Sequence, residues 1–342
     1  MSEKLTSINR ISKKLHVSQT GLRKYIFVYV SLIPILVLYF FLRVVPILKN
    51  FFYSMFYSKI GQPTFKFVGL QNFKDLFSDK LFLLSLKNTT IFALFVTVFS
   101  VIIALGVAIS LANDKKTGPF LETVYFLPVI TPMVPVAVVW KWIYDPSYGL
   151  LNYLLSIFGI QPVAWLVYPN TALMAIIIMS VWKVIGYNMI ILLVGIRDIP
   201  KIYIEAARID GASRKDILRK IIFPLLKPIM LFVFVISTIN SYNVFTQVYI
   251  MTTGSQGAPG NSVTTLVLDI YQNAFRYFRT GYAASEAVVL FIIILFLTYF
   301  QFKVSGEEKE EKRLRKLSNI RKHEQIIEFK KNQKLAQSAG LK

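Results

Sequence analysis

The chain has 342 residues, of which 55% are hydrophobic and 17% charged, and its mean hydropathy of +0.54 is too apolar for a soluble domain of this length. Its formal net charge is +21, but Lys and Arg gather at the edges of apolar stretches rather than on one soluble face, which argues against nucleic-acid binding. There is no Cys, and the two His residues, His16 and His323, lie in charged terminal segments; disulfides and thiol catalysis are excluded, and a metal site is strongly disfavoured.

Six apolar stretches are long enough to cross a bilayer as helices, because about 20 apolar residues span its hydrocarbon core. No small-residue cleavage site follows the first stretch, so we expect a span there and not a removed leader. The third stretch contains Pro128, Pro132 and Pro135, and we expect it to be irregular because proline frees backbone carbonyls that neighbouring groups must satisfy. The expected spans are residues 25–45, 89–111, 124–142, 172–196, 228–248 and 283–302.

The distribution of Lys and Arg predicts the orientation of these spans, since cytoplasmic loops carry an excess of positive charge. With both termini inside, the cytoplasmic segments hold 28 of the 39 Lys and Arg residues and the outer loops hold 8. Segment 46–88 holds six of those eight, but long loops count for less, and its stretch 67–79 is typical of an amphipathic helix at the outer interface. The fold predicted is an all-α integral membrane protein with six transmembrane helices and both termini cytoplasmic.

The predicted chain has three parts: a basic cytoplasmic segment at 1–24, a six-span domain at 25–303 and a charged tail at 304–342. The tail pairs Glu and Lys at i, i+4 spacing, which favours a charged helix continuing into the cytoplasm. Two roles are open for it: a solvated or lipid-touching segment, or a specific regulatory contact.

Two spans carry polar side chains at helical spacing, and such groups inside a membrane usually face a cavity. The two helical faces consist of Ser180, Lys183, Val184 and Tyr187 in the fourth span, and of Ser237, Asn240 and Ser241, followed by Asn243, in the fifth. The alternative is that these side chains bond neighbouring helices together. Lys183 is the most unusual, because a mid-span lysine is costly; we expect it to contact a substrate or a carboxylate of a partner subunit.

A charged hairpin is predicted between the fourth and fifth spans, at 205–224. Gly211 can adopt a positive φ in the turn, and Ser213 can cap the helix that follows. Pro224 then predicts a kink into the fifth span. The hairpin either only orients the protein through its positive charge or docks a soluble partner.

The residues of this hairpin resemble a known motif. "EAARIDG", then nine residues, then "IIFP" is similar to the cytoplasmic EAA loop of ATP-binding-cassette importer permeases. Phe223 stands where that family usually has leucine. The residues that match or form the motif's turn are Glu205, Ala206, Ala207, Asp210, Gly211 and Pro224.

Three further segments resemble the maltose-type carbohydrate branch of the same family: "FVGLQNF" at 67–73, "GLLNYLL" at 149–155 and "VLDIYQNAF" at 267–275. The two polar faces also align with positions that line the sugar site in maltose-type subunits. In the fifth span Val244 takes the place of the family's last asparagine, and Asn243 is displaced by one position. The resemblance covers roughly residues 25–303.

The resemblance implies the architecture of a type I importer permease in the bacterial cell membrane, forming half of a sugar pathway. It also implies a second permease subunit, two ATP-binding subunits that receive the EAA loops, and an extracytoplasmic solute-binding protein. The chain has no G-x-x-x-x-G-K-[ST] phosphate loop, so we expect a non-catalytic subunit without cofactors of its own, with ATP and Mg bound by the partner ATPase. Glu205 would pair with an ATPase arginine or cap its own helix.

Two other hypotheses are open. The first is a permease of the same type for another solute, such as glycerol phosphate or a polyol, which Lys183 would suit. The second is a secondary transporter, which is disfavoured because no acidic residue lies at mid-span.

Overall fold

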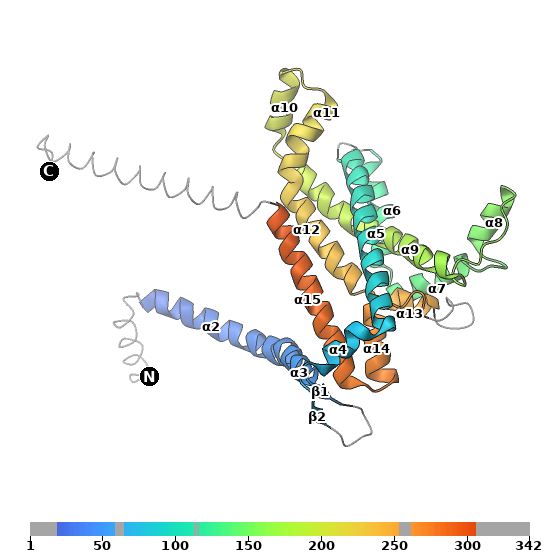
Figure 1. Ribbon diagram of the computed structural model, residues 1–342. Helices are drawn as coiled ribbons and strands as arrows, with labels where there is room; N and C mark the ends of the chain where they lie inside the picture. The colour runs from blue at the N-terminus through green and yellow to red at the C-terminus, as the bar shows by residue number, and fades with distance from the viewer. Residues whose placement is uncertain (1–18, 59–64, 113, 115, 253–260, 306–342) are drawn as a thin grey trace, which may run out of the picture. The chain divides into compact units, whose positions relative to one another are not determined.

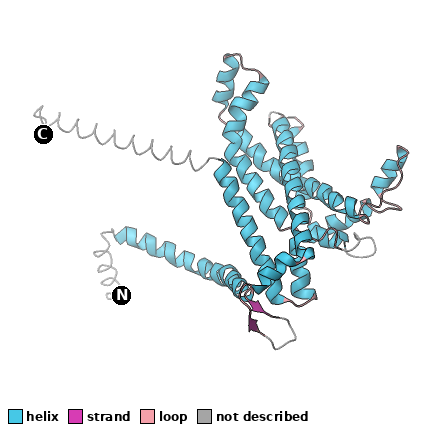
Figure 2. Ribbon diagram, viewed as in Figure 1, coloured by secondary structure: helices cyan, strands magenta, loops and turns pink. Residues whose placement is uncertain are grey.

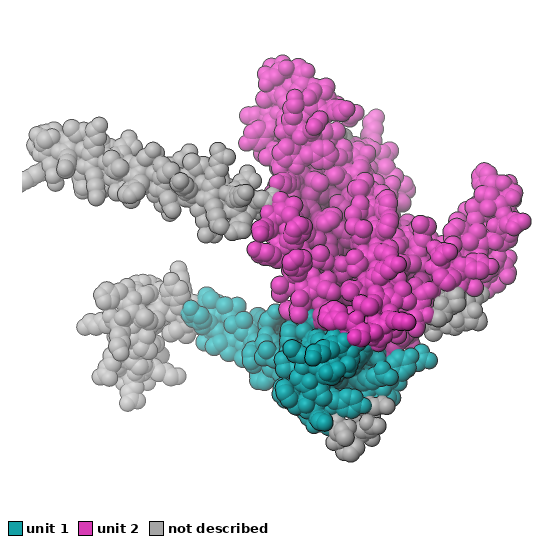
Figure 3. Space-filling model, in the orientation of Figure 1, with its two compact units in different colours: residues 1–75, 273–288 teal, residues 76–272, 289–342 magenta. Residues whose placement is uncertain are grey.

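The computed structural model describes residues 19–58, 65–112, 114, 116–252 and 261–305. The described chain is helical apart from one hairpin of two short strands (Figure 2). It divides into two units (Figure 3): residues 1–75 with 273–288, and residues 76–272 with 289–342. The tail predicted at 304–342 lies almost entirely outside the described residues, as do the two histidines.

The first unit begins with a long apolar helical path. It consists of α2 (Gln19–Tyr39), the π turn η1 (Phe40–Val44) and α3 (Val45–Tyr53). The span expected at 25–45 is found, but the apolar helix runs from Phe27 to Tyr53. Strand β1 (Phe56–Tyr57) then pairs antiparallel with β2 (Lys66–Phe67), with Phe56 opposite Phe67.

A helix is present within the stretch 67–79, as α4 (Gln71–Ser78). In the first unit, the Asn72 side chain donates hydrogen bonds to the carbonyls of Ser54 and Phe56, at 2.8 and 3.0 Å. Asn72 thus ties the start of this helix to the β hairpin. The π turn η3 (Gln272–Arg276) and the first part of α15 (Thr280–Ser305) complete the unit.

The second unit is built around α5 (Lys80–Leu111) and α9 (Pro169–Arg197), which pack together (Figure 1). Fully buried alanines, Ala104 and Ala108 on α5 and Ala172 and Ala175 on α9, are the small residues that membrane helices use for close approach. Its other helices are α6 (Gly118–Ile130), α7 (Met133–Ile143), α8 (Leu150–Ile157), α10 (Lys201–Ile209), α11 (Arg214–Ile217), α12 (Phe223–Tyr242), α13 (Thr246–Thr252), α14 (Leu266–Tyr271) and the rest of α15.

By length and composition, five helices of the described chain can each cross a membrane, and α6 with α7 makes a sixth span if the pair counts as one. These two helices are bent by 98° at Thr131–Pro132. The prediction of an irregular third span is therefore confirmed. The second span starts earlier than expected, because Asp79 caps α5 by accepting a 2.8 Å hydrogen bond from the Leu81 N–H.

The predicted end of the fifth span was wrong. The helix ends at Tyr242 and not at Val248, because the chain leaves the helical path at Asn243 and begins α13 at Thr246. Pro224 lies in the first turn of α12, after the π turn η2 (Leu218–Ile222). Proline lacks an N–H, and the wider π turn directly before it interrupts the regular hydrogen-bond pattern. Pro224 therefore lies inside the helical path of α11, η2 and α12 without ending it.

Candidate functional site

The hairpin formed by α10 and α11 has the predicted geometry. Gly211 has a φ of +78°, the left-handed conformation that glycine adopts without strain. Ser213 caps α11: its hydroxyl oxygen accepts a 3.2 Å hydrogen bond from the Asp216 N–H and donates to the Asp216 carboxylate at 2.5 Å. Figure 1 shows the two helices extending beyond the end of α9.

One side of this hairpin packs on the rest of the second unit, and the other side is exposed. Ile217 is buried in the apolar cluster that contains Leu192 and Leu226, and Ala207 and Ala212 pack against the same cluster. α10 itself buries no residue, and its last residue, Ile209, is 87% exposed. Of the predicted docking residues, Glu205, Ala206, Asp210, Gly211 and Pro224 are exposed and Ala207 is half-buried.

Glu205 lies in the middle of α10, away from the helix N-terminus that a cap would require. Within the described part of the chain, its carboxylate has no hydrogen bond or ion pair. The structure thus leaves Glu205, like the exposed apolar residues beside it, available to another molecule.

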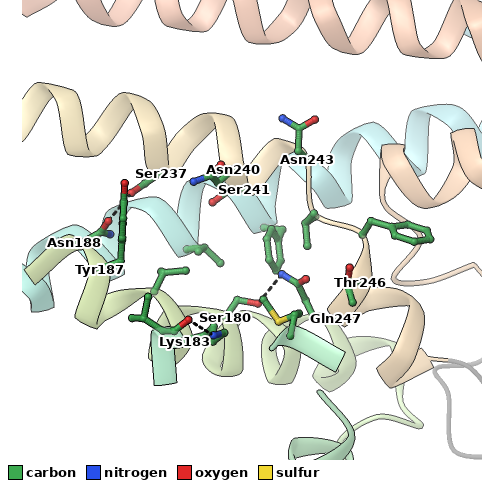
Figure 4. A pocket seen from close by; sticks show the side chains of 17 residues that line it. Ser180, Lys183, Tyr187, Asn188, Ser237, Asn240, Ser241, Asn243, Thr246 and Gln247 are labelled. Atoms are coloured by element: carbon green, nitrogen blue, oxygen red, sulfur yellow. Dashed lines mark hydrogen bonds between the residues drawn. The ribbon is translucent and has the colours of Figure 1, made fainter. Parts of the chain in front are cut away.

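All eight residues predicted for a substrate pathway line a single pocket of about 390 Å³ in the second unit. Such a volume suits a small organic ligand, since ligand pockets span roughly 300–1,000 Å³. α9 and α12 supply most of the polar groups, and no acidic residue is found among the described residues that line the pocket. Figure 4 labels its polar side chains: Ser180, Lys183, Tyr187, Asn188, Ser237, Asn240, Ser241, Asn243, Thr246 and Gln247.

Some of these polar groups are already engaged within the protein. Ser237 donates to the Asn188 side-chain oxygen at 3.2 Å, and Asn188 donates to the Ser100 hydroxyl at 3.1 Å, so one network links α12, α9 and α5. The Asn243 amide bonds back to the Ile239 carbonyl at 2.8 Å and points away from the other labelled side chains (Figure 4). These groups stabilise helices more than they offer contacts to a ligand.

Other polar groups in the pocket have no hydrogen-bond partner among the described residues. Among the described residues, the side chains of Tyr187, Asn240, Ser241 and Thr246 have no hydrogen-bond partner, and the contact from Gln247 to Ser180 is long, at 3.5 Å. Hydroxyl and amide groups can both donate and accept, which matches a ligand rich in hydroxyls. A tyrosine ring can cover an apolar face of such a ligand.

Lys183 has partners that neither expectation anticipated. It lies at the middle of α9 and is only 7% exposed. Its ammonium donates to the backbone carbonyls of Pro128, Val129 at 3.2 Å and Thr131 at 2.7 Å, where α6 ends. The cost of a mid-span charge is therefore met inside this chain.

Asn188, Thr246 and Gln247 line the pocket but were not predicted from the sequence. Asn188 follows Tyr187 directly, and the spacing i, i+3, i+4, i+7 does not include it. Thr246 and Gln247 reach the pocket because α13 starts after the break at Asn243. The polar run that ends at Asn243 was the available signal for that break. No group of metal-ligating side chains occurs in the described ranges.

Known proteins share both the sequence and the fold. The family model for the binding-protein-dependent transport system inner membrane component matches residues 100–305. The probable ABC transporter permease protein YurN of Bacillus subtilis is 35% identical over 83% of this chain and 97% of its own. The trehalose/maltose transport system permease protein MalF of Thermococcus litoralis is 32% identical over 81% of this chain and 92% of its own.

A solved structure has the same fold. It is a bacterial ABC transporter involved in the import of the acidic polysaccharide alginate, and the match has a TM-score of 0.73 at 22% identity. It covers 84% of this chain and 98% of that chain.

Proposed function

Because this chain belongs to the family of inner membrane components of binding-protein-dependent transport systems, we propose that it forms half of the translocation pathway of an ATP-driven importer for a disaccharide or oligosaccharide. As a permease, it is a multi-pass, non-catalytic subunit in the cell membrane. It moves its substrate without changing any covalent bond.

The observation that carries the sugar assignment is the pocket. It gathers all eight predicted pathway residues. Tyr187, Asn240, Ser241 and Thr246 leave hydroxyl and amide groups free for exchange with sugar hydroxyls, and the relative from Thermococcus litoralis is named for trehalose and maltose transport. The only charged group in the lining, Lys183, already has three acceptors for its three N–H donors. An uncharged, hydroxyl-rich solute therefore suits the pocket better than a phosphate ester.

The remaining subunits of the importer are part of the proposal. A second permease subunit would complete the pathway, and an extracytoplasmic solute-binding protein would deliver the sugar. Two ATPase subunits would bind ATP and Mg and would each receive a hairpin like the one at α10–α11. The free face of α10, with Glu205, Ala206 and Ile209, supports docking over the simpler role of orienting the chain.

Coupling requires that ATP binding favour one arrangement of the spans over another. Closure of the ATPase dimer would bring the two docked hairpins together. α11 continues through η2 into α12 as one helical path, so movement of the hairpin would be transmitted to the helix that carries Asn240 and Ser241. The pocket would then open alternately to the two sides of the membrane.

The test is reconstitution of the chain in proteoliposomes with its second permease, ATPase and solute-binding protein. ATP hydrolysis and uptake are measured against neutral disaccharides and oligosaccharides, glycerol phosphate and polyols. Stimulation by a neutral sugar is expected. Stimulation by glycerol phosphate or a polyol alone would favour the alternative substrate, and uptake driven by an ion gradient without ATP would favour a secondary transporter.

A further inference from the structure

The break in the third span leaves carbonyl groups without their helical partners. In an α-helix each carbonyl accepts a hydrogen bond from the N–H four residues later. For Pro128 that residue is Pro132, and for Thr131 it is Pro135; proline has no N–H. The 98° bend also separates the carbonyls of Val129 and Ile130 from the N–H groups of Met133 and Val134. Four carbonyls are thus freed at the end of α6, in a region where water is scarce.

The Lys183 ammonium satisfies three of these four carbonyls. It donates to the carbonyls of Pro128, Val129 and Thr131. Lysine has three N–H donors and no acceptor, so the numbers of donors and acceptors agree. The Leu127 carbonyl, just before them, accepts from the Thr131 hydroxyl at 3.2 Å. The positive charge also lies at a helix C-terminus, where the helix dipole favours a cation.

The packing of α6 against α9 holds the lysine at this place. Gly186 is one turn beyond Lys183 on α9, and a Cβ atom added there would collide with the backbone carbonyl of Tyr125 on α6. The absence of a side chain at Gly186 lets the two helices approach closely. The ammonium can then reach the carbonyls of α6 from the middle of α9.

We propose that Lys183 is a positioning residue that keeps the third span broken, acting as a tethered cation for the carbonyls that Pro132 and Pro135 leave without donors. Val129 and Met133 stand on the two sides of the break, and both line the pocket. Lys183 therefore shapes the pocket wall through the break and does not donate to the substrate. This role in transport rests on the proposed sugar pathway; the role in the break does not.

The first experiment measures the bend directly in the reconstituted importer without sugar. The chain has no Cys, so nitroxide labels can be placed at exposed Phe120 on α6 and Val139 on α7 after substitution to Cys. A straight helix would separate these positions by about 28 Å, and the bend makes the distance shorter. Lys183→Met should lengthen or broaden the distance distribution by several ångströms. Lys227→Met, which removes an exposed lysine of α12, should leave it unchanged.

The second experiment is a double-mutant cycle between Lys183 and the two prolines. Pro132→Ala and Pro135→Ala together restore N–H donors, so Lys183→Met should lower the melting temperature of the importer at most half as much in that background as it does alone. If Lys183→Met alone does not assemble, the same background should restore assembly. An equal loss of melting temperature in both backgrounds, or no restored assembly, would overturn the proposal.

Sugar titration separates this role from direct contact. With Lys183→Met we expect the maximal rate of sugar-stimulated ATP hydrolysis to fall, together with the changed distance. An unchanged distance distribution combined with a tenfold or larger rise in the half-saturating sugar concentration would show that Lys183 binds substrate, and the positioning role would be wrong. If the wild-type importer responds to no sugar, the proposed function fails while the distance measurement still tests the break.

Discussion

The hairpin of α10 and α11 and the pocket between α9 and α12 are both polar regions of an apolar chain, but they treat their side chains in opposite ways. In the hairpin, apolar side chains are exposed: Ile202 is 69% and Ile209 87% exposed. In the pocket, polar side chains are buried: Ser237 is 7% and Ser241 5% exposed. Each region departs from the usual arrangement in the direction its proposed partner requires.

The two regions therefore suit different kinds of partner. An exposed apolar surface beside charged groups is typical of a protein interface, which supports the proposed docking of the hairpin on another polypeptide. A buried polar group costs free energy unless it is hydrogen-bonded, so the buried groups of the pocket require internal partners, a solute or water. The network of Ser237, Asn188 and Ser100 supplies internal partners for part of the pocket, and the rest is left for the solute.

Gly211→Pro should have the largest effect, because it disrupts the turn of the hairpin. Proline holds φ near −65°, whereas Gly211 has +78° and donates its N–H to the Arg208 carbonyl at 3.1 Å. The hairpin should lose its turn, and sugar uptake should fall by at least about 100-fold, matching the roughly 3 kcal/mol that a misplaced proline costs. Uptake and co-purification of the ATPase measure this.

Gly159→Pro is the matched control. Gly159 also has a positive φ, +72°, in an exposed loop after α8. The Gly159→Pro variant should have the same local strain and still bind the ATPase. Normal uptake by the Gly211 variant would contradict a docking role for the hairpin.

A second change tests the exposed side of the hairpin without disturbing its fold. Ile209→Asp puts a charge where the side chain is 87% exposed, so the stability of the chain itself should hardly change. If Ile209 is central to the interface, ATPase affinity should fall about 30-fold, as for a hot spot of about 2 kcal/mol. Ile157→Asp on α8, at a position 64% exposed, is the control, and equal ATPase binding by both variants would place the interface elsewhere.

The sequence predicted the hairpin well because its signals are local. Gly211 and Ser213 determine the turn and the cap within a few residues. Helical spacing within single spans likewise predicted the residues that the pocket brings together. These features require no knowledge of which helices are neighbours.

What the sequence did not reveal depends on the backbone and on contacts between helices. Thr246 and Gln247 reach the pocket only because the fifth span ends at Tyr242, yet Val244 and Phe245 continue its apolar pattern. Lys183 bonds to carbonyls, which no pattern of side chains displays. Counting which carbonyls have proline four residues later would have identified two of the three acceptors, Pro128 and Thr131, but not that α9 lies beside them.

Within the pocket, Asn240→Ala tests the groups left for the solute. Among the described residues its amide has no hydrogen-bond partner, so the loss should appear in sugar binding and not in stability. The half-saturating sugar concentration should rise about tenfold, as expected for one hydrogen bond worth about 1.4 kcal/mol. Asn243→Ala is the matched control, since the Asn243 amide is bonded to the Ile239 carbonyl; it should change the concentration less than threefold, and a larger effect for Asn243 would reverse the assignment.

Ser237→Ala should have the smallest effect on transport, although it lies in the same predicted face. The Ser237 hydroxyl donates to Asn188, which donates to Ser100. Removing this hydroxyl removes the hydrogen bond that links α12 to α9 and, through α9, to α5. We expect a loss of about 1 kcal/mol of stability, measured as a lower melting temperature, with sugar affinity changed less than twofold. Ser237→Ala could instead weaken sugar binding as much as Asn240→Ala and leave the melting temperature unchanged. That result would show that the hydroxyl binds the solute during transport, because the loss of a hydrogen bond within the protein is expected to lower stability.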